Sequence, residues 1–224
     1  MGVGVANPLA DIPERETQTP RGEPAASIFH VMSVVRPDEC RALEGLFRLY
    51  DESGRTSRMS HSRRINSVYL GGNPVWERMK PGISVPVGTA KIAARVSSLI
   101  QLENVNRWKF DIVPFPSMCI SPELTLDWQE AGGDGVPWHS DYTAREDKKD
   151  VAFEPKLVAI VQLSDPLDYE GGEFEVYSGT QIVRPELEQG DMILFPSFLL
   201  HRRKPITRGR RFIMMTQAFG ARWR

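Results

Sequence analysis

The sequence predicts a mainly β fold, a sandwich or jelly roll with two N-terminal helices packed on one of its sheets. Helical spacing of apolar residues is confined to two segments before residue 105, and short β-rich runs alternate with glycine, proline and aspartate after it. Strands this short at such regular intervals are typical of antiparallel all-β domains. We expect one domain, because 224 residues with 41% hydrophobic side chains suffice for one sizeable core.

The chain divides into an arm and a single domain. Residues 1–26 contain scattered prolines and charges without an apolar period, so this stretch buries too little surface to offset the cost of ordering it. We interpret it as a flexible N-terminal arm. Residues 27–224 are expected to form the domain, with a helical part over about 27–104 and a β-core over about 105–220.

Two segments show the spacing of an amphipathic helix. The first opens with Pro37, which is favoured in a first helical turn because its missing N–H is not needed there. Its apolar residues at helical spacing are Cys40, Leu43, Leu46, Phe47 and Tyr50. The second helix is expected over about 88–102, where Ile92, Ala93, Val96, Leu99 and Ile100 form one stripe. We expect both helices to cover one sheet of the β-core.

The β-core is expected to consist of short strands separated by turns. Residues 165–173 and 188–191 are rich in turn-forming side chains and lie between β-rich runs. The expected strands include Trp108 to Val113, Leu124 to Trp128, Leu157 to Leu163, Glu173 to Tyr177, Gln181 to Val183, Met192 to Phe195 and Phe212 to Ala218.

Composition and charge exclude several classes of protein. A net charge of -1 gives no overall attraction to nucleic acid or membrane, although basic residues gather after residue 202 and around residues 55–64. Two cysteines are too few for a disulfide framework, and no CxxC pair is present for a thiolate metal site. Without a secretory leader or a run of about 18 apolar residues, we expect a cytoplasmic protein with no membrane span.

Three residues have the spacing and chemistry of a metal site. His139 and Asp141 are two positions apart, so on extended backbone both side chains point to the same side. His201 follows a strand-like stretch 60 residues after Asp141 and can supply a third ligand from a distant part of the chain. Two imidazoles and one carboxylate on one face of iron leave positions open for other ligands, the arrangement of non-haem iron oxygenases.

Arg211 is a candidate anchor for a carboxylate. It stands at the start of the apolar run 212–215, so its side chain can enter the barrel, whereas Arg210 points the opposite way on a strand. A guanidinium forms two parallel hydrogen bonds to a carboxylate, which a lysine does less specifically. We interpret Arg210 as a solvated residue.

From residue 108 to residue 219 the sequence resembles the iron(II)/2-oxoglutarate-dependent dioxygenase superfamily, in particular its prolyl 4-hydroxylase-like branch and related bacterial hydroxylases. The motifs are WHSD, QLSDPLDYEGGEFEV, GDMILFPS and HRRKPITRGRR. Together they are far more specific than the His-x-Asp triplet alone. The resemblance implies a double-stranded β-helix, which is a jelly roll with the metal at its open end, and it implies Fe(II), 2-oxoglutarate and dioxygen as cofactor and co-substrates.

Carried over by position, His139 and Asp141 match the family's first two iron ligands and His201 matches the third. Arg211 matches the basic residue that binds 2-oxoglutarate. The resemblance implies no catalytic residue beyond this metal centre.

Two positions depart from the family pattern. Trp128 stands on a strand where the family often has a tyrosine that helps to bind 2-oxoglutarate, and its indole N–H can donate a hydrogen bond but cannot accept one. We assign Trp128, with Arg211, to the co-substrate pocket. Arg203 stands where relatives commonly carry a small apolar residue.

The resemblance implies hydroxylation of an unactivated C–H bond, and we expect the substrate to be an amino acid or a related small metabolite. Desaturation and cyclisation by the same oxidant remain open. Halogenation is not expected, because the related halogenases lack the carboxylate that Asp141 supplies. One alternative is a hydroxylase of a protein or peptide residue, such as proline, and a remote one is a non-enzymatic, cupin-like metal-binding protein.

Several features bear on the substrate. Trp138 and Tyr142 flank the first two ligands and either line the pocket or are simply packed. Residues 143–154 form a charged insertion that is either a lid or a solvated surface loop. The basic residues Arg55, Arg58, Arg63 and Arg64 lack interleaved aromatic residues for base stacking, so a nucleic-acid substrate is not favoured.

Overall fold

The computed structural model describes residues 29–52, 57–58, 66–69, 87–113, 125–130, 135–142 and 153–223. The predictions for residues 1–26, for Arg55, Arg63 and Arg64, and for residues 143–152 of the charged loop lie outside this part of the chain. Within the described residues, no helix is long and apolar enough to cross a membrane.

The elements follow one another in two blocks. The first contains β1 (His30–Ser33), α1 (Pro37–Glu52), β2 (Ser57–Arg58), β3 (Asn66–Tyr69), α3 (Val87–Glu103) and a π-helical turn over Asn104–Trp108. The second contains β4 (Thr125–Glu130), β5 (Val136–His139), β6 (Phe153–Gln162), a 3-10 turn over Pro166–Asp168, β7 (Tyr169–Gly171), β8 (Phe174–Tyr177), β9 (Ile182–Val183), β10 (Asp191–Pro196), β11 (His201–Arg203) and β12 (Ile206–Ala221). Both helices lie where the apolar spacing predicts them.

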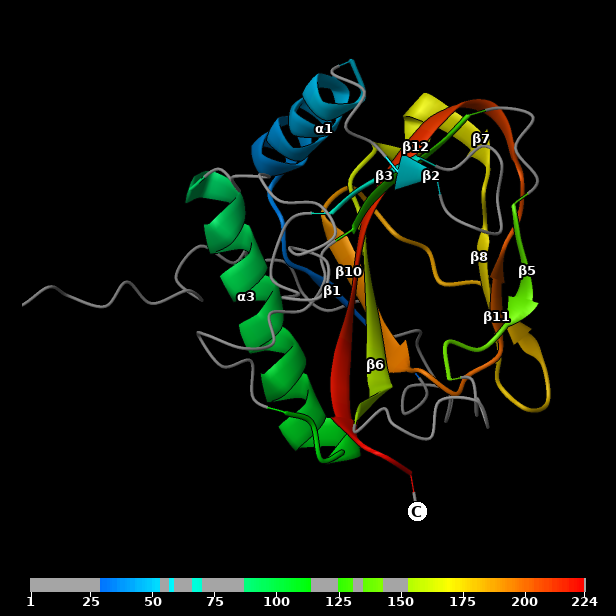
Figure 1. Cartoon of the computed structure of the whole chain (residues 1–224). Helices are drawn as coiled ribbons and strands as arrows, with labels where there is room; N and C mark the ends of the chain where they lie inside the picture. The colour runs from blue at the N-terminus through cyan, green and yellow to red at the C-terminus, as the bar shows by residue number, and fades with distance from the viewer. Residues whose placement is uncertain are drawn as a thin grey trace, which may run out of the picture.

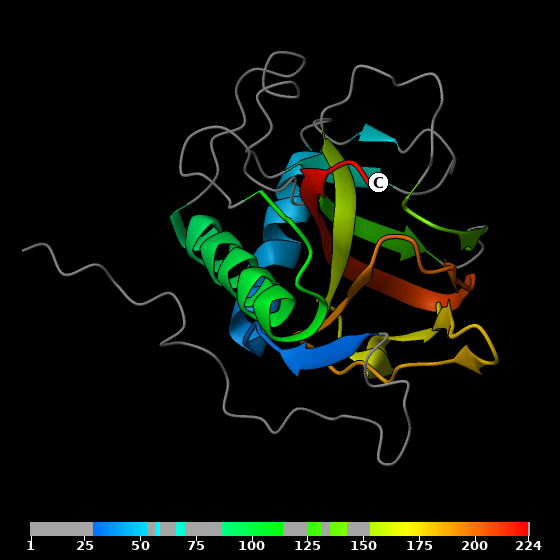
Figure 2. The same cartoon turned by 90° about the horizontal axis from the view of Figure 1, so that it is seen from below.

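The strands form two facing sheets with both helices on one side. The major sheet has the order β1-β10-β6-β12-β4-β3-β2, with β7 also paired to β12, and the minor sheet has the order β5-β11-β8-β9. Figure 1 shows the minor sheet beside the major sheet, with α1 and α3 beyond the opposite face of the major sheet. Seen from below in Figure 2, the two helices again lie together on that side. The predicted jelly roll with N-terminal helices packed on one sheet is confirmed.

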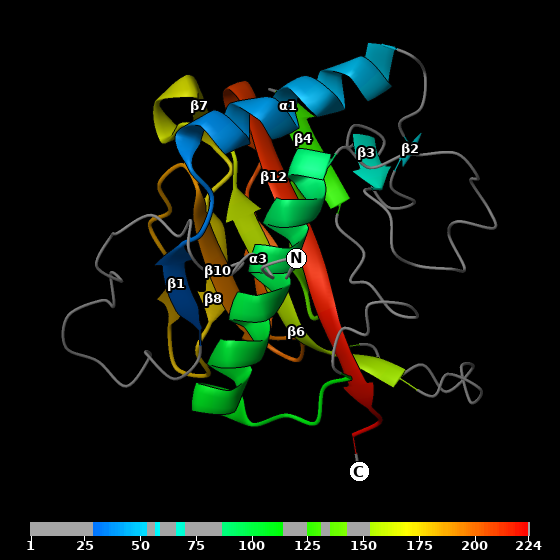
Figure 3. The ribbon, with the colours of Figure 1, turned by 90° about the vertical axis from the view of Figure 1, so that its left-hand side faces the viewer.

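Two hydrophobic cores result from the alternation of side chains along each strand. On β6, Leu157, Ala159 and Val161 pack in a cluster with the helices, whereas Val158 and Ile160 pack in a second cluster with residues of the minor sheet. The first core attaches the helices, which cross the major sheet in Figure 3. The second core fills the interior of the barrel. The same alternation on β12 decides which of its side chains enter that interior.

The expected strand over Trp108 to Val113 is wrong. Here Asn104–Trp108 forms a π-helical turn that ends at Lys109, whose φ of 56° is left-handed. The Asn104 side chain accepts a hydrogen bond from Phe110 N and donates one to Phe110 O, at 3.0 and 2.8 Å. These contacts close a local turn, and the following residues make only an isolated bridge through Ile112.

The other differences concern the extent of the strands. The last expected strand, Phe212 to Ala218, is part of a longer one, because β12 spans Ile206–Ala221 and pairs with β4, β6 and β7 in turn. The region expected to be helical over about 27–104 also contains β1, β2 and β3. These strands are two to four residues long, too short for an alternating pattern to reveal them.

Residues 188–191, where the sequence predicts a turn, lead into β10 and also contact the end of β1. Gly190 has a φ of 89°, in the left-handed region. Its carbonyl oxygen accepts hydrogen bonds from the N–H groups of Val34 and Val35, at 2.9 and 3.1 Å. A Cβ atom at Gly190 would collide with the carbonyl oxygen of Val35. Only glycine therefore fits this position without backbone movement.

Replacing Gly190 by alanine should lower the free energy of unfolding by about 2–4 kcal/mol, because both the positive φ and the collision must be relieved. Gly179→Ala is a matched control, since Gly179 has a φ of 90° but nothing within 4 Å of its added Cβ. It should cost about 1 kcal/mol, the penalty for the left-handed conformation alone. Chemical denaturation measures both losses, and equal losses would contradict a role for the collision.

Candidate metal centre

His139 and His201 lie side by side on neighbouring antiparallel strands. β5 ends at His139, β11 begins at His201, and the two residues are paired in register. Because opposed residues project their side chains to the same face, the two imidazoles meet, with ring centroids 4.3 Å apart. That face is the barrel interior, since the His201 ring lies 5.5 and 4.9 Å from the buried rings of Phe174 and Phe195.

Asp141 completes a cluster of three groups that are able to bind a metal. It follows His139 by two positions, and its Oδ1 lies 3.5 Å from His139 Nε2. One potential ligand atom from each of His139, Asp141 and His201 lies within 4.8 Å of the others. The structure therefore brings together the three residues that the sequence spacing selects.

Backbone carbonyl groups orient both histidine rings. Nδ1 of His139 lies 2.8 Å from the carbonyl oxygen of Pro137, and Nδ1 of His201 lies 2.9 Å from that of Leu199. A carbonyl oxygen only accepts hydrogen bonds, so each Nδ1 carries the hydrogen and donates it. The lone pair of each neutral ring is then on Nε2, the nitrogen available to a metal.

The electrostatics of the cluster favours a positive charge between its members. The hydrogen bond with Asp141 raises the pKa of His139 above its ordinary value. Burial alone would raise the pKa of Asp141, but its contact with His139 and the nearby His201 outweigh burial and lower that pKa. Burial lowers the pKa of His201. The cluster thus combines an ionised carboxylate with a buried imidazole that stays neutral.

Arg211 points into the same barrel interior. Its side chain is 3% exposed, whereas the neighbouring Arg210 is exposed, as their opposite directions on β12 predict. Nε of Arg211 donates to Gln162 Oε1 at 2.8 Å, and Nη1 donates to the carbonyl oxygen of Gly172 at 2.6 Å. These two bonds fix the direction of the guanidinium group. Among the described residues, Nη2 makes no hydrogen bond.

A cavity of about 560 Å³ opens beside Arg211. Its lining includes Arg211, Tyr169, Gly172 and Phe174. The Tyr169 hydroxyl accepts a hydrogen bond from Gln162 Nε2 at 3.1 Å, so one amide group holds both Tyr169 and Arg211. Phe174 lines this cavity and also packs against the His201 ring, at 5.5 Å between ring centroids, although none of the three cluster residues lines the cavity itself.

Residues 126–217 match the family model described as the 2OG-Fe(II) oxygenase superfamily, in which 2OG stands for 2-oxoglutarate. This stretch contains the whole cluster of His139, Asp141 and His201, and also Arg211. This part of the chain is therefore similar to the 2OG-Fe(II) oxygenase superfamily.

Proteins with sequences similar to this chain include PKHD-type hydroxylases. One from Pseudomonas fluorescens is 39% identical over 83 residues, which are 37% of this chain and 36% of the relative. Another from Pseudomonas putida is 30% identical over 137 residues, 60% of this chain and 58% of the relative. The chain therefore matches less than two thirds of the length of either relative.

A solved structure shares the fold over most of this chain. The crystal structure of a Pseudomonas putida prolyl-4-hydroxylase matches with a TM-score of 0.64, covering 89% of this chain and 96% of that chain at 16% sequence identity. This likeness shows a shared fold, and the family match and the PKHD-type relatives agree with the resemblance that the sequence motifs indicate.

The residues of the cluster fit the iron(II) that the superfamily name implies. Two imidazole nitrogens and one carboxylate oxygen are a donor set suited to Fe(II), with positions left for co-substrates. Oδ2 of Asp141 is buried and has no hydrogen-bond partner among the described residues. A buried carboxylate oxygen without a partner is costly, and a bound cation removes that cost.

The structure describes only the backbone of Trp128. This residue lies in β4 and is paired in register with Phe212 of β12. Its side chain lies outside the described part of the chain, so the expected contact of Trp128 with 2-oxoglutarate stays a prediction.

Trp138 and Tyr142 make different contacts. The guanidinium carbon of Arg202 is 4.7 Å from the centre of the Trp138 ring, a contact on the outer face of the minor sheet. Tyr142 N donates to the Ser197 carbonyl oxygen at 3.0 Å, and its ring lies 6.5 Å from that of Trp223. A part in substrate binding stays a prediction for both residues.

Sequence reasoning missed two polar residues near the site. Gln162 holds Arg211, and Gln217 is among the groups whose influence lowers the pKa of Asp141. Both occupy strand positions whose neighbours two residues away are apolar and face the interior, namely Ile160 and Met215. A polar side chain in a row of alternating apolar residues that face the interior is the sequence signal that could have identified both glutamines.

An ion cluster fixes the outer side of the strand that carries His201. Glu175 of β8 is completely buried, and its carboxylate accepts hydrogen bonds from Arg184 at 2.7 Å and Arg202 at 2.5 Å. Lys204 Nζ lies 3.4 Å from the same carboxylate. Burial alone would raise the pKa of Glu175, but the three cations outweigh burial and lower the pKa to about 2. These pairs hold β11 against β8.

We expect Glu175 to make the stability of the fold depend on pH in acid. Its carboxyl group has a pKa of about 2 in the folded chain and about 4.3 in an unfolded chain. Its stabilisation is therefore complete above about pH 5 and is lost as the pH falls toward about 2. Partial exposure of the three cations reduces the effect to about 1–2 kcal/mol.

Glu175→Gln should accordingly flatten the decline of unfolding free energy between about pH 5 and pH 2.5. Urea denaturation at a series of pH values measures this slope. Glu186→Gln, at an exposed position, is the matched control and should leave the slope unchanged. A wild-type slope in Glu175→Gln would contradict the assigned ion cluster.

Proposed function

We propose that this protein is an Fe(II)- and 2-oxoglutarate-dependent dioxygenase that hydroxylates an unactivated C–H bond. The observation that carries the proposal is the convergence of His139, Asp141 and His201 in the barrel, with each histidine presenting Nε2. Such a set on one side of iron leaves room for a bidentate co-substrate and for dioxygen. Iron(II) with these co-substrates supplies the oxidising power, as 2-oxoglutarate is decarboxylated to succinate and the C–H bond becomes C–OH.

Arg211 binds the far carboxylate of 2-oxoglutarate in this proposal. Gln162 and Gly172 hold its Nε and Nη1, so the guanidinium is oriented before the co-substrate arrives. Its Nη2 is then the group that meets the carboxylate. Burial of Arg211 strengthens this ion pair, because charges in a site shielded from water are screened weakly.

Phe174 and Phe195 keep the distal ligand in a dry environment. Their rings pack against the His201 ring, and both side chains are buried. A fixed, water-poor surrounding holds the ligand ring in one orientation and limits side reactions of the bound oxidant.

For the substrate we propose an amino acid or a related small metabolite. The support is the charged character of the interior, where Arg203 is buried as well as Arg211. A hydroxylase of a protein or peptide residue is the second candidate, and the fold likeness to a prolyl-4-hydroxylase favours it. A peptide substrate needs an open groove, whereas a small metabolite needs an enclosed pocket.

The test of the reaction class begins without oxygen. Purified protein loaded with Fe(II) should give a weak visible charge-transfer band when 2-oxoglutarate is added. Both His139→Ala and His201→Ala should lose the band, since each removes one of three ligands. Aerobic incubation with amino acids and peptides should then release succinate. A missing band in the wild type, or a band that persists in both variants, would contradict the assignment of these histidines as iron ligands.

Arg211→Ala separates the co-substrate anchor from the metal site. We expect the 2-oxoglutarate concentration for half-maximal band formation to rise about 100-fold, the loss typical for a buried charge-assisted pair. Iron binding, measured by metal titration, should stay near the wild-type value. Arg210→Ala, at the exposed neighbouring position, is the control and should leave both quantities unchanged. A small effect of Arg211→Ala would contradict its assigned role.

A further inference from the structure

The strand ladder fixes Asp141 less directly than the two histidines of the cluster. His139 ends β5, His201 begins β11, and the two are paired in register. Asp141 lies two residues beyond β5, and within the described part of the chain it has no strand partner. The short separation brings its carboxylate near His139 but leaves the exact position to other contacts. Those contacts come from the next residue, Tyr142.

The backbone of Tyr142 is tied to the start of β6. Its N–H donates to the carbonyl oxygen of Ser197 at 3.0 Å. Ser197 in turn donates from its N–H to the Lys156 carbonyl oxygen at 2.9 Å and from its hydroxyl to that of Pro155 at 2.6 Å. Since Lys156 and Pro155 lie in β6, the major sheet holds the backbone beside Asp141 on one side.

The side chain of Tyr142 packs against Trp223, which follows β12. The two rings are 6.5 Å apart at an interplanar angle of 88°, an edge-to-face contact. The Trp223 ring also meets Phe198, in the turn that precedes His201, at 5.7 Å and 73°. One indole thus contacts both the residue after Asp141 and the turn before His201.

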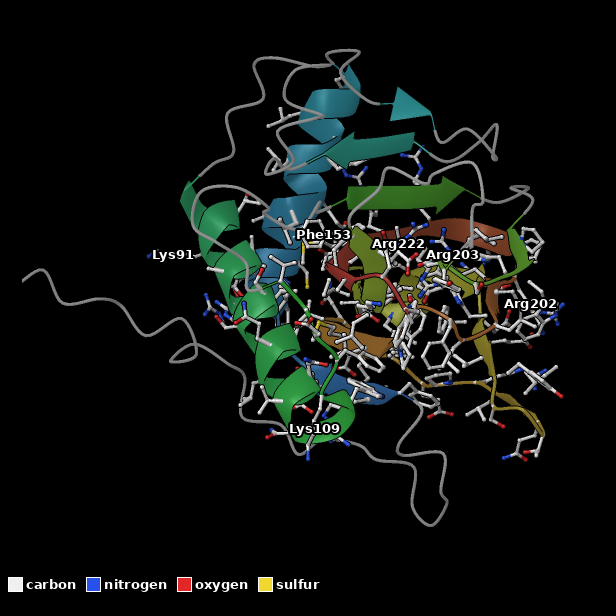
Figure 4. The ribbon with its side chains drawn as sticks, turned by 60° about the horizontal axis from the view of Figure 1, so that its bottom comes forward. Lys91, Lys109, Phe153, Arg202, Arg203 and Arg222 are labelled. Carbon is white, nitrogen blue, oxygen red and sulfur yellow. The ribbon has the colours of Figure 1, made fainter. Side chains whose placement is uncertain are left out.

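Other contacts hold Trp223 in place. Its N–H donates to Glu154 Oε2 at 3.0 Å, and the Lys156 ammonium lies 3.7 Å from the centre of its ring. The Phe110 ring meets it edge-on, 5.0 Å away at 86°. Figure 4 shows Arg222, the preceding residue, at the end of the barrel where β6 begins. The indole therefore has a fixed position of its own, independent of Tyr142.

We infer that Trp223 is a positioning residue of the metal centre, which acts through Tyr142 and holds the Asp141 carboxylate in place beside the two histidines. This inference rests on the proposed function, because it takes the three residues as ligands of iron(II). Loss of the indole frees the Tyr142 ring and the segment that carries Asp141, whereas the strand ladder still holds the histidines. A carboxylate that samples more positions loses more freedom when it binds an ion, so the affinity for the ion falls.

A purely structural role for Trp223 predicts a different pattern. Its loss would then lower the unfolding temperature and leave the metal site unchanged. Trp108 provides the comparison, because it is another tryptophan that is partly buried, against the core that attaches the helices. Its loss should destabilise the fold without affecting the ion, so the two tryptophans separate stability from metal binding.

The experiment titrates Co(II) into the full chain and records metal affinity, the visible spectrum of the complex and the thermal unfolding temperature. The spectrum reports the ligand set of the ion. A wild type that binds no Co(II) would contradict the proposed function itself. Trp223→Ala should bind Co(II) about tenfold more weakly, the loss typical of removing a group that orients a metal ligand, and its complex should have an altered spectrum. Trp223→Phe should restore most of the affinity, since a phenyl ring can make the same edge-to-face contact.

Two comparisons locate the effect. Trp108→Ala should keep the wild-type Co(II) affinity and spectrum. Asp141→Ala should weaken Co(II) binding, and adding Trp223→Ala to it should cause no further loss, because the carboxylate that the indole positions is absent. Trp223 is 36% exposed, so its variants should fold, and the metal-free unfolding temperature establishes this. If Trp223→Ala does not fold, Trp223→Leu takes its place.

Three results would overturn the inference. The first is a Trp223→Ala variant with the wild-type Co(II) affinity and spectrum. The second is a Trp108→Ala variant that loses as much Co(II) affinity as Trp223→Ala does. The third is a loss from Trp223→Ala that is equally large with and without the Asp141 carboxylate, which would mean that the indole acts on another part of the site.

Discussion

The pairing of β11 between β5 and β8 is the constraint on which the site depends. It sets His201 opposite His139 on one side and opposite Val176 on the other, so both imidazoles project into the barrel. Asp141 follows His139 by two positions, and this short separation is enough to bring its carboxylate next to the His139 ring. A shift of β11 by one residue would turn His201 outward and bring Arg202 into the interior.

Backbone groups, more than other side chains, organise the functional atoms. The carbonyl groups of Pro137 and Leu199 each select the hydrogen position on a histidine, and that of Gly172 holds Arg211. Pro137 lies in β5, whereas Leu199 and Gly172 lie in the short connections before β11 and β8. Backbone carbonyl groups have no side-chain rotamers to lose, so they hold these side chains at little entropic cost on binding. The site is therefore arranged before a metal or co-substrate arrives, as electrostatic preorganisation requires.

Sequence reasoning located the parts of the site that depend on local alternation. His139 with Asp141, and the choice of Arg211 over Arg210, follow from the two-residue period of a strand, and the structure places these side chains accordingly. The two long helices were equally predictable from the sequence, because apolar residues repeat at helical spacing in each. The hydrogen-bond partners of Arg211 could not be predicted in this way. Gln162 is 49 residues away in the sequence and meets Arg211 only because β6 pairs with β12. The turn at Asn104–Trp108 was not predicted, because the composition of residues 108–113 is strand-like and the hydrogen bonds of the Asn104 side chain override it.

The position of β12 has a consequence for how the chain acquires its structure. This last described strand lies inside the major sheet, between β6 and β4, and β1 pairs with β10 more than 150 residues later. Neither the centre of the sheet nor the complete docking surface for the helices exists until β12 has left the ribosome. Synthesis and folding are thus separated in time, and the nascent chain exposes unpaired strand edges until β12 inserts.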